Sequence, residues 1–380
     1  MRASCILCLS LALSTHVSVA NSAKTIVAWG SGSLTNIPSG LTNVVSLSTG
    51  GQHCLALKED GAVVAWGATS YGQTAIPADL TNVGAVAAGV YHSLAVTADG
   101  GVRAWGRNTY GQSQVPAGLS NVIAIAAGNN HSLVLRSDGT MVNWGQYYDG
   151  GSFVPLPIPR EWTNIVAISA GAEHDLFLRR DGSVVALGLN NADGQCDVPI
   201  DLTNAVAVAA GNNHSLALKA DGTVVAWGGN NWGQIEVPSG LAGVASIAAG
   251  ADYNLALRSN GVLVAWGKNL DGQATVPPGL TNVIGLVAAM DVSFALIQIR
   301  LSPLPATFVP ASNPVWNGTS FSVSVQTASG AAYQLEHVDA LDSTNWAVLA
   351  PVSGDGQIKV LSDPGAKTAQ RFYRVRKVGP

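Results

Sequence analysis

The sequence has 380 residues, of which 47% are hydrophobic and 11% are charged, and it contains 43 glycines. A chain this long and apolar buries a large core, which excludes an intrinsically disordered protein. The net charge of −4 shows no overall excess of basic residues that would favour binding to a phosphate backbone, so we expect no nucleic-acid partner.

The first 20 residues, MRASCILCLSLALSTHVSVA, have the pattern of a secretory signal peptide. One basic residue, Arg2, precedes an apolar run over residues 5–13, and small residues follow at Ser18 and Ala20. The run is shorter than the about 20 residues that a membrane-spanning helix needs. We therefore expect residues 1–20 to be removed. The mature protein is then secreted, extracellular or in the cell envelope, without a transmembrane segment.

From residue 24 to residue 299 the chain repeats one unit. The glycine that opens the unit recurs with spacings of 39, 39, 43, 40 and 39 residues, at Gly50, Gly89, Gly128, Gly171, Gly211 and Gly250. A period of this length with several short strands is typical of a propeller blade or a solenoid coil.

Each unit predicts three strands. Around Gly128, the segments NVIAIAAG (residues 121–128), HSLVLRSD (131–138) and TMVNWG (140–145) have the alternation and β-branched content of strands. The Asp-Gly pair between the second and third segments favours a tight hairpin turn. A polar loop and a Pro-containing segment then lead into the next unit.

The two ends of the array predict a closed ring. KTIVAWG (residues 24–30) is a third strand without a first and second, and residues 281–299 form a first and second strand without a third. Joined in space, the two fragments make one unit, and closure removes the exposed edges of an open array. Six complete units and one split unit predict an all-β, seven-bladed β-propeller closed by a split blade.

These units resemble the repeat of the RCC1 (regulator of chromosome condensation) family, with its GxxHSLAL, DG, WG and NxxGQ signatures. The compact period and the AWG strand resemble most the bacterial β-lactamase-inhibitor protein II family. The resemblance covers residues 24–299 and implies a propeller that binds other macromolecules through its loops. The chain departs from the pattern at Leu187 for Trp, Tyr253 for His, Asn260 for Asp, Ala289 for Gly and Val292 for His.

After the repeats, residues 300–314 read as a Pro-rich linker and residues 315–380 as a small β-rich, sandwich-like module. The predicted strands of this module are SFSVSVQT, AAYQLEHV, WAVLA, QIKVL and RFYRVR. Outside the leader, Cys54 and Cys196 lie in different repeats, and their positions favour small packing residues over a disulfide.

Three residue types recur at fixed positions and predict structural roles. The histidines are expected to hydrogen-bond backbone in their own or a neighbouring blade: His53, His92, His131, His174 and His214. The turn aspartates are Asp60, Asp99, Asp138, Asp181 and Asp221. The packing tryptophans are Trp29, Trp66, Trp105, Trp144, Trp227 and Trp266. No nucleophile with its base, phosphate loop or metal motif stands apart from the repeat, so we expect neither an enzyme nor a cofactor or metal.

The residues that differ between units are the candidates for binding. The loop after the first strand and the loop after the third strand emerge at the same end of a blade. The candidates in these loops are Trp232, Tyr147, Tyr148, Tyr71, Tyr110, Tyr91, Asp252 and Glu173. Aromatic and amide side chains on loops over a rigid scaffold are typical of binding faces. The alternative is that an aromatic before Gly-Gln only braces the next blade.

The sequence thus predicts a monomeric, exported protein-binding module, either an inhibitor of a secreted enzyme or a surface-interaction module. Acidic residues outnumber basic ones on this end, with Asp149, Glu173, Asp193, Asp252 and Asp271 against Arg107 and Lys268. This excess predicts a basic or amide-rich partner. The alternative is carbohydrate binding, because the same side chains suit sugar rings and hydroxyls. A propeller hydrolase or lyase is the least favoured function.

Overall fold

The structure is a computed structural model that describes residues 22–300, 311–316, 320–327, 329, 331–338, 347–353, 355–363 and 372–378. The predicted signal peptide and most of the predicted linker lie outside these residues. The chain divides into two compact units, one containing Ala23–Ile299 and the other Arg300–Pro380. Its described part includes one short 3-10 helix, η1 (Ser33–Thr35), and no helix with the length and apolarity of a membrane span.

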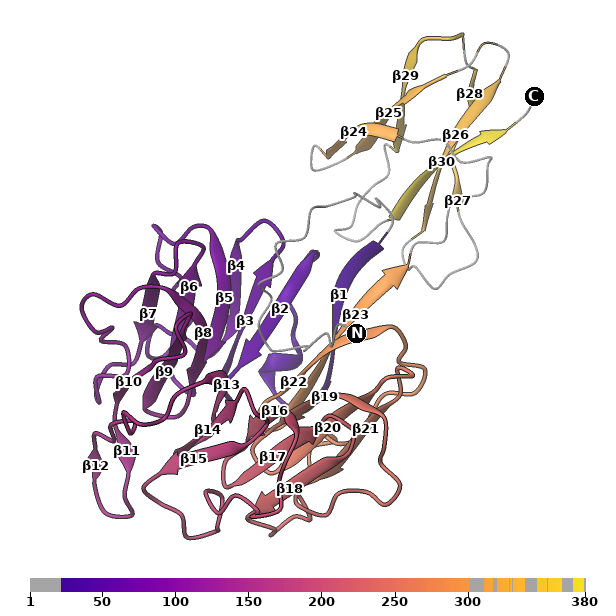
Figure 1. Ribbon diagram of the computed structural model, residues 1–380. Coiled ribbons are helices and arrows are strands. Elements are labelled where there is room, and N and C mark those ends of the chain that lie inside the picture. The colour runs from indigo at the N-terminus through magenta and orange to yellow at the C-terminus, as the bar shows by residue number, and fades with distance from the viewer. Residues whose placement is uncertain are drawn as a thin grey trace. The chain divides into compact units, whose positions relative to one another are not determined.

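The first unit is built from three-stranded antiparallel sheets that follow one another along the chain (Figure 1). Six sheets of residues 22–300 are formed by consecutive strands: β2 (Val44–Thr49), β3 (His53–Lys58) and β4 (Val63–Gly67); β5 (Val83–Ala88), β6 (His92–Thr97) and β7 (Val102–Gly106); β8 (Val122–Ala127), β9 (His131–Arg136) and β10 (Met141–Gly145); β13 (Ile165–Ala170), β14 (His174–Arg179) and β15 (Val184–Gly188); β16 (Ala205–Ala210), β17 (His214–Lys219) and β18 (Val224–Gly228); β19 (Val244–Ala249), β20 (Tyr253–Arg258) and β21 (Leu263–Gly267).

Another sheet unites the two ends of this unit. Its strand order is β1 (Ser22–Gly30), β23 (Val292–Arg300) and β22 (Val283–Ala288). The first strands of successive sheets contact each other, and β22 contacts β2 of the first consecutive sheet. The sheets therefore surround a common axis.

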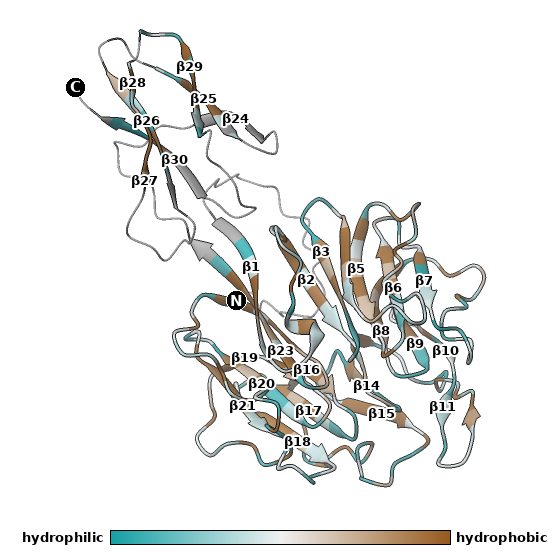
Figure 2. Cartoon of the chain, turned by 180° about the vertical axis from the view of Figure 1, so that it is seen from behind, coloured by the Kyte–Doolittle hydropathy of each residue, from teal (hydrophilic) through white to brown (hydrophobic). Residues whose placement is uncertain are grey.

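The core lies between neighbouring sheets. In Figure 2 the strands carry most of the hydrophobic colour and the loops most of the hydrophilic colour. Every middle strand of the six consecutive sheets is buried over its first five residues. Between the first two sheets, Leu55 and Leu57 pack with Val86 and Trp105. Each sheet thus contributes one apolar face to each of two neighbours.

The Asp-Gly hairpins form as the sequence predicts. Asp60 Oδ1 accepts a hydrogen bond from the Ala62 amide at 3.0 Å, and Gly61 has a φ of 79°. Only residues that tolerate the left-handed region fit this position. The aspartates at the other expected hairpins make the same contact, so their role is structural. We call the end of the sheets that carries these turns the hairpin face.

The repeat histidines join neighbouring sheets through hydrogen bonds to side chains, whereas the sequence predicts bonds to the backbone. His53 Nε2 lies 2.7 Å from Ser93 Oγ of the next sheet. The equivalent pairs are His92–Ser132 (2.9 Å), His131–Asp175 (2.9 Å), His174–Ser215 (2.9 Å) and His214–Asn254 (2.8 Å). The prediction of backbone partners is therefore wrong for these Nε2 atoms, because the next sheet places a polar side chain in front of each ring. We call these contacts the histidine junctions.

Each junction also holds the preceding loop. Ser93 Oγ donates to the Gln73 carbonyl at 2.8 Å, so Ser93 accepts a hydrogen bond from His53 Nε2–H. Trp105 Nε1 donates to the same carbonyl at 2.8 Å. Burial lowers the pKa of His53 to about 4, with a smaller opposing contribution from the Val90 backbone. The ring is therefore neutral at pH 7.

The His131 junction is built around a carboxylate. Asp175 replaces the usual serine, and Leu187 replaces the usual tryptophan of that sheet. The Tyr147 hydroxyl donates to Asp175 Oδ2, and its ring stacks on His131 with centroids 4.0 Å apart. Burial, followed by the Asp175 charge, raises the pKa of Tyr147 well above its usual range. Tyr147 belongs to a two-stranded hairpin, β11 (Tyr147–Tyr148) and β12 (Phe153–Val154), that extends the preceding loop.

The second unit has two sheets in its described residues. One contains β24 (Ala311–Trp316), β25 (Phe321–Gln326) and β29 (Ile358–Asp363). The other contains β26 (Ala332–Val338), β27 (Ala347–Val348), β28 (Val352–Ser353) and β30 (Phe372–Val378). Val323 and Leu361 of the first sheet share a core with Leu335 and Val375 of the second. This unit has its own apolar interior.

Candidate functional site

The loops after the first and third strands meet at one end of the first unit, as predicted. The amide of Arg107, after β7, donates to the Tyr91 carbonyl, after β5, at 2.9 Å. The Lys268 amide donates to the Asp252 carbonyl at the same distance in a later sheet. We call this end the loop face. All eight predicted binding residues belong to its two loop sets.

Buried glutamines hold the loop-face backbone. Gln73 Oε1 accepts a hydrogen bond from the Tyr71 amide at 2.9 Å, and Gln234 Oε1 accepts one from the Trp232 amide at 2.8 Å. Gln73 is 0% exposed and Gln234 is 2% exposed, whereas Tyr71 and Trp232 are 48% and 45% exposed. The glutamine, rather than the aromatic ring, therefore positions the loop, and the ring faces solvent.

Five aromatic side chains of the loop face form two groups of contacting rings, one of two rings and one of three. We call them the aromatic arc: Tyr71, Tyr91, Tyr110, Tyr148 and Phe153. The rings of Tyr71 and Tyr91 lie 4.9 Å apart between centroids. Tyr110 stacks on Phe153 at 4.2 Å, and Tyr148 lies 5.2 Å from the same ring. The predicted residues Tyr71, Tyr91, Tyr110 and Tyr148 are thus brought together.

Phe153 was not among the predicted site residues. It reaches the arc because the β11–β12 hairpin folds back, with Tyr148 opposite Phe153. The signal in the sequence was the spacing of 43 residues between Gly128 and Gly171, which marks an insertion. The sequence pattern did not reveal that the insertion pairs with itself.

A second group on the loop face is rich in charge. We call it the charged arc: Trp232, Asp252, Lys268, Asp271 and Asp291. Lys268 Nζ lies 3.0 Å from Asp291 Oδ1 and 5.9 Å from the centroid of the Trp232 ring. Its hydrogen bond to Asp291 is the main cause of the raised pKa of Lys268. Burial raises the pKa of Asp252, while Lys268 opposes this shift.

Two predicted contact residues have supporting roles. Tyr147 is 1% exposed, so the prediction that it is a surface aromatic is wrong; its ring fills the space beside His131. Glu173 is half-buried and accepts hydrogen bonds from the Tyr148 amide at 2.8 Å and from Asn129 Nδ2 at 3.2 Å. Glu173 therefore holds the Tyr148 loop in place.

The acidic excess of the loop face is also partly committed to local structure. Asp149 accepts hydrogen bonds from the amides of Gly151 and Ser152, and the Ser152 contact is the first cause of its lowered pKa. Asp271 Oδ1 accepts a hydrogen bond from Ser31 Oγ at 2.8 Å. A count of charges in the sequence therefore exaggerates the acidic groups that have no local partner.

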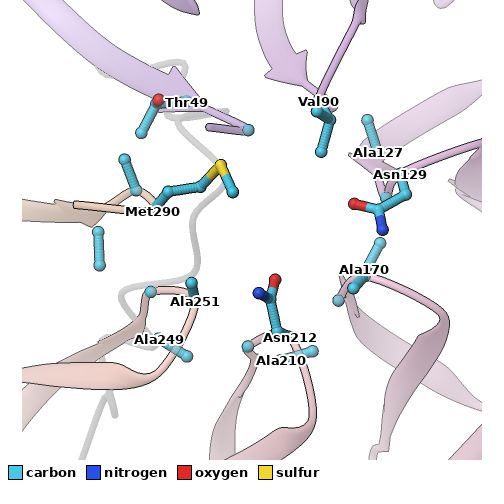
Figure 3. Close-up of a pocket in the computed structure, with 18 of the residues that line it drawn as sticks. Thr49, Val90, Ala127, Asn129, Ala170, Ala210, Asn212, Ala249, Ala251 and Met290 are labelled. Carbon is cyan, nitrogen blue, oxygen red and sulfur yellow. The ribbon is translucent and has the colours of Figure 1, made fainter. Parts of the chain in front are cut away.

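A narrow opening lies at the centre of the loop face (Figure 3). Its volume is about 100 Å³, and its lining comes from the ends of the first strands. Asn129, Asn212 and Met290 reach toward the opening among alanines. The residues of this lining include no ionisable side chain, and the described residues contain no cluster of potential metal ligands. The aromatic and charged arcs are therefore the stronger candidates for a binding site.

Comparison with known proteins shows what the repeats and fold are similar to. A model of the regulator of chromosome condensation (RCC1) repeat matches residues 44–73, 85–112, 122–150, 205–234 and 244–273. No curated protein matches the chain.

Solved structures share the fold at low sequence identity. Prp20p from Saccharomyces cerevisiae is 21% identical, with 75% of this chain and 93% of that chain covered and a TM-score of 0.60. Human WBSCR16 is 20% identical, with coverages of 67% and 86% and a TM-score of 0.56. The CRINKLY ectodomain of the receptor kinase ACR4 from Arabidopsis thaliana is 19% identical, with coverages of 68% and 97% and a TM-score of 0.51. This chain therefore contains RCC1-type repeats and has the β-propeller fold of the RCC1 proteins.

Proposed function

We propose that this chain is an exported, monomeric protein-binding module. In this proposal residues 1–20 are a signal peptide and residues 24–299 a seven-bladed propeller closed by a split blade. The linker is confined to residues 301–310, because β24 begins at Ala311, and the β-sandwich-like module covers residues 311–380. The partner binds on the loop face. The two forms of this role are inhibition of a secreted enzyme, by analogy with β-lactamase-inhibitor protein II, and attachment at the cell surface.

The observation that supports the proposal is that aromatic side chains of the loop face are exposed although they do not hold the loop backbone in place. Trp232 is 45% exposed and Tyr71 is 48% exposed, although buried glutamines already hold both loops. Exposed rings with fixed backbones lose little conformational freedom on binding, and aromatic anchors carry a large share of interface energy. Prp20p, which shares the fold, has binding properties to Gsp1p and histones.

The test is capture of the native partner. The purified chain, immobilised through its C-terminus, is exposed to culture medium and envelope extract of the producing organism, and retained proteins are identified by mass spectrometry. Trp232→Ala should weaken capture about tenfold, because a half-exposed anchor is lost while Gln234 still holds the loop. The melting temperature should stay nearly unchanged.

The matched control is Lys219→Ala on the hairpin face, where Lys219 lies 3.6 Å from Asp221. This variant should capture as well as the unaltered chain. Loss of capture with Lys219→Ala and full capture with Trp232→Ala would place the binding surface on the opposite face.

Carbohydrate binding is the alternative, and the two groups of contacting rings in the aromatic arc favour it over an enzymatic role. Flat aromatic surfaces suit the apolar faces of sugar rings, and the carboxylates of the charged arc suit hydroxyl groups. A glycan array separates the two functions. Selective binding of a glycan, lost with Tyr71→Ala, would support this alternative over a protein partner.

A further inference from the structure

We infer that Arg107 binds a carboxylate of the partner protein, in a site walled by Tyr71, Tyr91 and Tyr110. This inference rests on the proposed function and specifies the chemistry of one contact. It differs from the charge count, which pointed to a basic or amide-rich partner for the whole face. Beside the aromatic arc, Arg107 instead offers a positive charge to an acidic side chain of the partner.

Three aromatic rings surround the guanidinium. Arg107 Cζ lies 5.3 Å from the ring centroid of Tyr71, 5.4 Å from that of Tyr91 and 5.2 Å from that of Tyr110. These tyrosines come from three different loops, so the arrangement requires the folded face. Ring contacts of this kind stabilise the cation and restrict its side chain before any partner arrives.

The charge of Arg107 has no acidic partner among the described residues. Its Nε donates to Thr109 Oγ1 at 3.3 Å, and no ion pair or further side-chain hydrogen bond of the guanidinium is found in the described part of the chain. Lys268 of the charged arc differs, because it lies 3.0 Å from Asp291. The terminal nitrogens of Arg107 are therefore available to an incoming group.

The chemistry of this site fits a carboxylate. A guanidinium offers parallel N–H groups that match the two oxygens of a carboxylate, and it still does so when rings contact its faces. The rings half-bury Arg107, so water screens the new ion pair less than at a fully exposed site. The hydroxyl of Tyr91 accepts a weak hydrogen bond from Gln52 Nε2 at 3.4 Å, which leaves its proton for the same carboxylate.

The experiment selects ligands rather than assuming one. A random peptide library displayed on phage is panned on the immobilised full chain and, in parallel, on Arg107→Gln. Enriched peptides are synthesised and their affinities are measured by fluorescence polarisation. We expect the enriched sequences to contain Asp or Glu, and replacement of that residue by its amide should weaken binding about tenfold. Arg107→Gln should cause a similar loss, and the two losses should not add.

Two further variants isolate the role of the guanidinium. Arg107→Lys keeps the charge without the paired N–H groups, so it should recover only part of the affinity. Arg103→Gln is the matched control, because Arg103 is a half-exposed arginine on β7 whose Nε lies 4.0 Å from Asp79 Oδ2 and which has no ring contact among the described residues. The affinity of Arg103→Gln for the enriched peptides should equal that of the unaltered chain.

Several outcomes would overturn the inference. One is enrichment of peptides that contain no Asp or Glu, and another is no enrichment of peptides above background. A third is binding of the enriched peptides to Arg107→Gln as tightly as to the unaltered chain. Capture of a native partner that depends on Trp232 but not on Arg107 would contradict this inference and leave the proposed function intact. Absence of any captured partner would instead count against the proposed function.

Discussion

The histidine junctions and the loop face come from the same repeat, yet they accommodate sequence change differently. At the Asp175 junction three changes occur together. Asp175 replaces serine, Leu187 replaces tryptophan, and the hydroxyl of Tyr147, from the extended loop, donates a hydrogen bond to Asp175. On the loop face the residue before Gly-Gln changes from Tyr71 to Trp232 while the same glutamine contact persists. At the Asp175 junction the substitutions are therefore coupled, whereas at these two loop positions the side chain changes without a change in the glutamine that holds the loop.

The largest expected loss of stability comes from a deletion in the interior. Deletion of residues 24–30 removes most of β1, including the buried Ile26 and Trp29, and exposes an edge of β23. Loss of a paired strand and an indole anchored to the Gln273 carbonyl should make the protein insoluble or lower its melting temperature strongly. Differential scanning calorimetry on the soluble fraction measures the change. Cooperative melting at the temperature of the unaltered chain would show that β1 does not support the sheets.

Acid should also act on the interior. Burial lowers the pKa of His53, His174 and His214 to about 4 and that of His92 to about 3, against 6.5 without burial. Below pH 6.5 the unfolded chain binds more protons than the folded one, so stability is complete above pH 6.5 and falls as the pH approaches 4. At pH 5 we expect a loss of about 2 kcal/mol per histidine.

Urea denaturation at pH 7, 6 and 5 measures this loss. His92→Gln, which cannot titrate, is the control and should lose about 2 kcal/mol less than the unaltered chain between pH 7 and pH 5, because the other buried histidines still titrate. Equal stability of the unaltered chain at pH 7 and pH 5 would contradict burial of neutral rings.

The junctions themselves should differ in strength. His131→Ala leaves the buried carboxylate of Asp175 with the Tyr147 hydroxyl but without its imidazole donor, so we expect a loss of about 3 kcal/mol or more. His92→Ala leaves the neutral Ser132 hydroxyl and should cost about 1 to 3 kcal/mol. Urea denaturation compares the two variants. Equal losses would mean that the Asp175 junction is no more dependent on its histidine than the others.

The smallest effect on stability is expected on the loop face. Tyr148→Ala removes a ring of the aromatic arc but keeps the amide that donates to Glu173 at 2.8 Å. Its melting temperature should remain nearly unchanged, and capture of the partner should weaken about tenfold. Tyr147→Ala is the contrasting variant, because its buried ring stacks on His131. Early melting of Tyr148→Ala with normal capture would place Tyr148 in the framework.

Much of the fold could be predicted because its determinants are local. The alternation of hydrophobic residues predicts the strands, and the Asp-Gly pairs predict the hairpin turns. The predicted strands and the turn between the second and third are confirmed in β8, β9 and β10. The common end of the two loop sets followed from strand direction alone. These properties depend on residues close together in the chain.

The partners of the repeat histidines depend on residues far apart. His53 and Ser93 are 40 positions apart, and their contact is set by how two sheets pack rather than by a local pattern. The burial of Tyr147 also depends on distant residues, because the sequence of a loop does not show whether its aromatic side chain packs inward or is exposed to water. Leu187 departs from the repeat pattern and lies opposite Asp175 across the β14–β15 hairpin, but the partners of Asp175, His131 and Tyr147, come from the preceding repeat.

The buried glutamines have a consequence for engineering this scaffold. Because Gln73, Gln112, Gln234 and Gln273 each bind the backbone amide two residues earlier, the side chains at those earlier positions do not determine the course of the loop. Four sites, at Tyr71, Tyr110, Trp232 and Asp271, can therefore be randomised together without a new design of the core. A combinatorial library at these sites would sample new affinities on one unchanged frame.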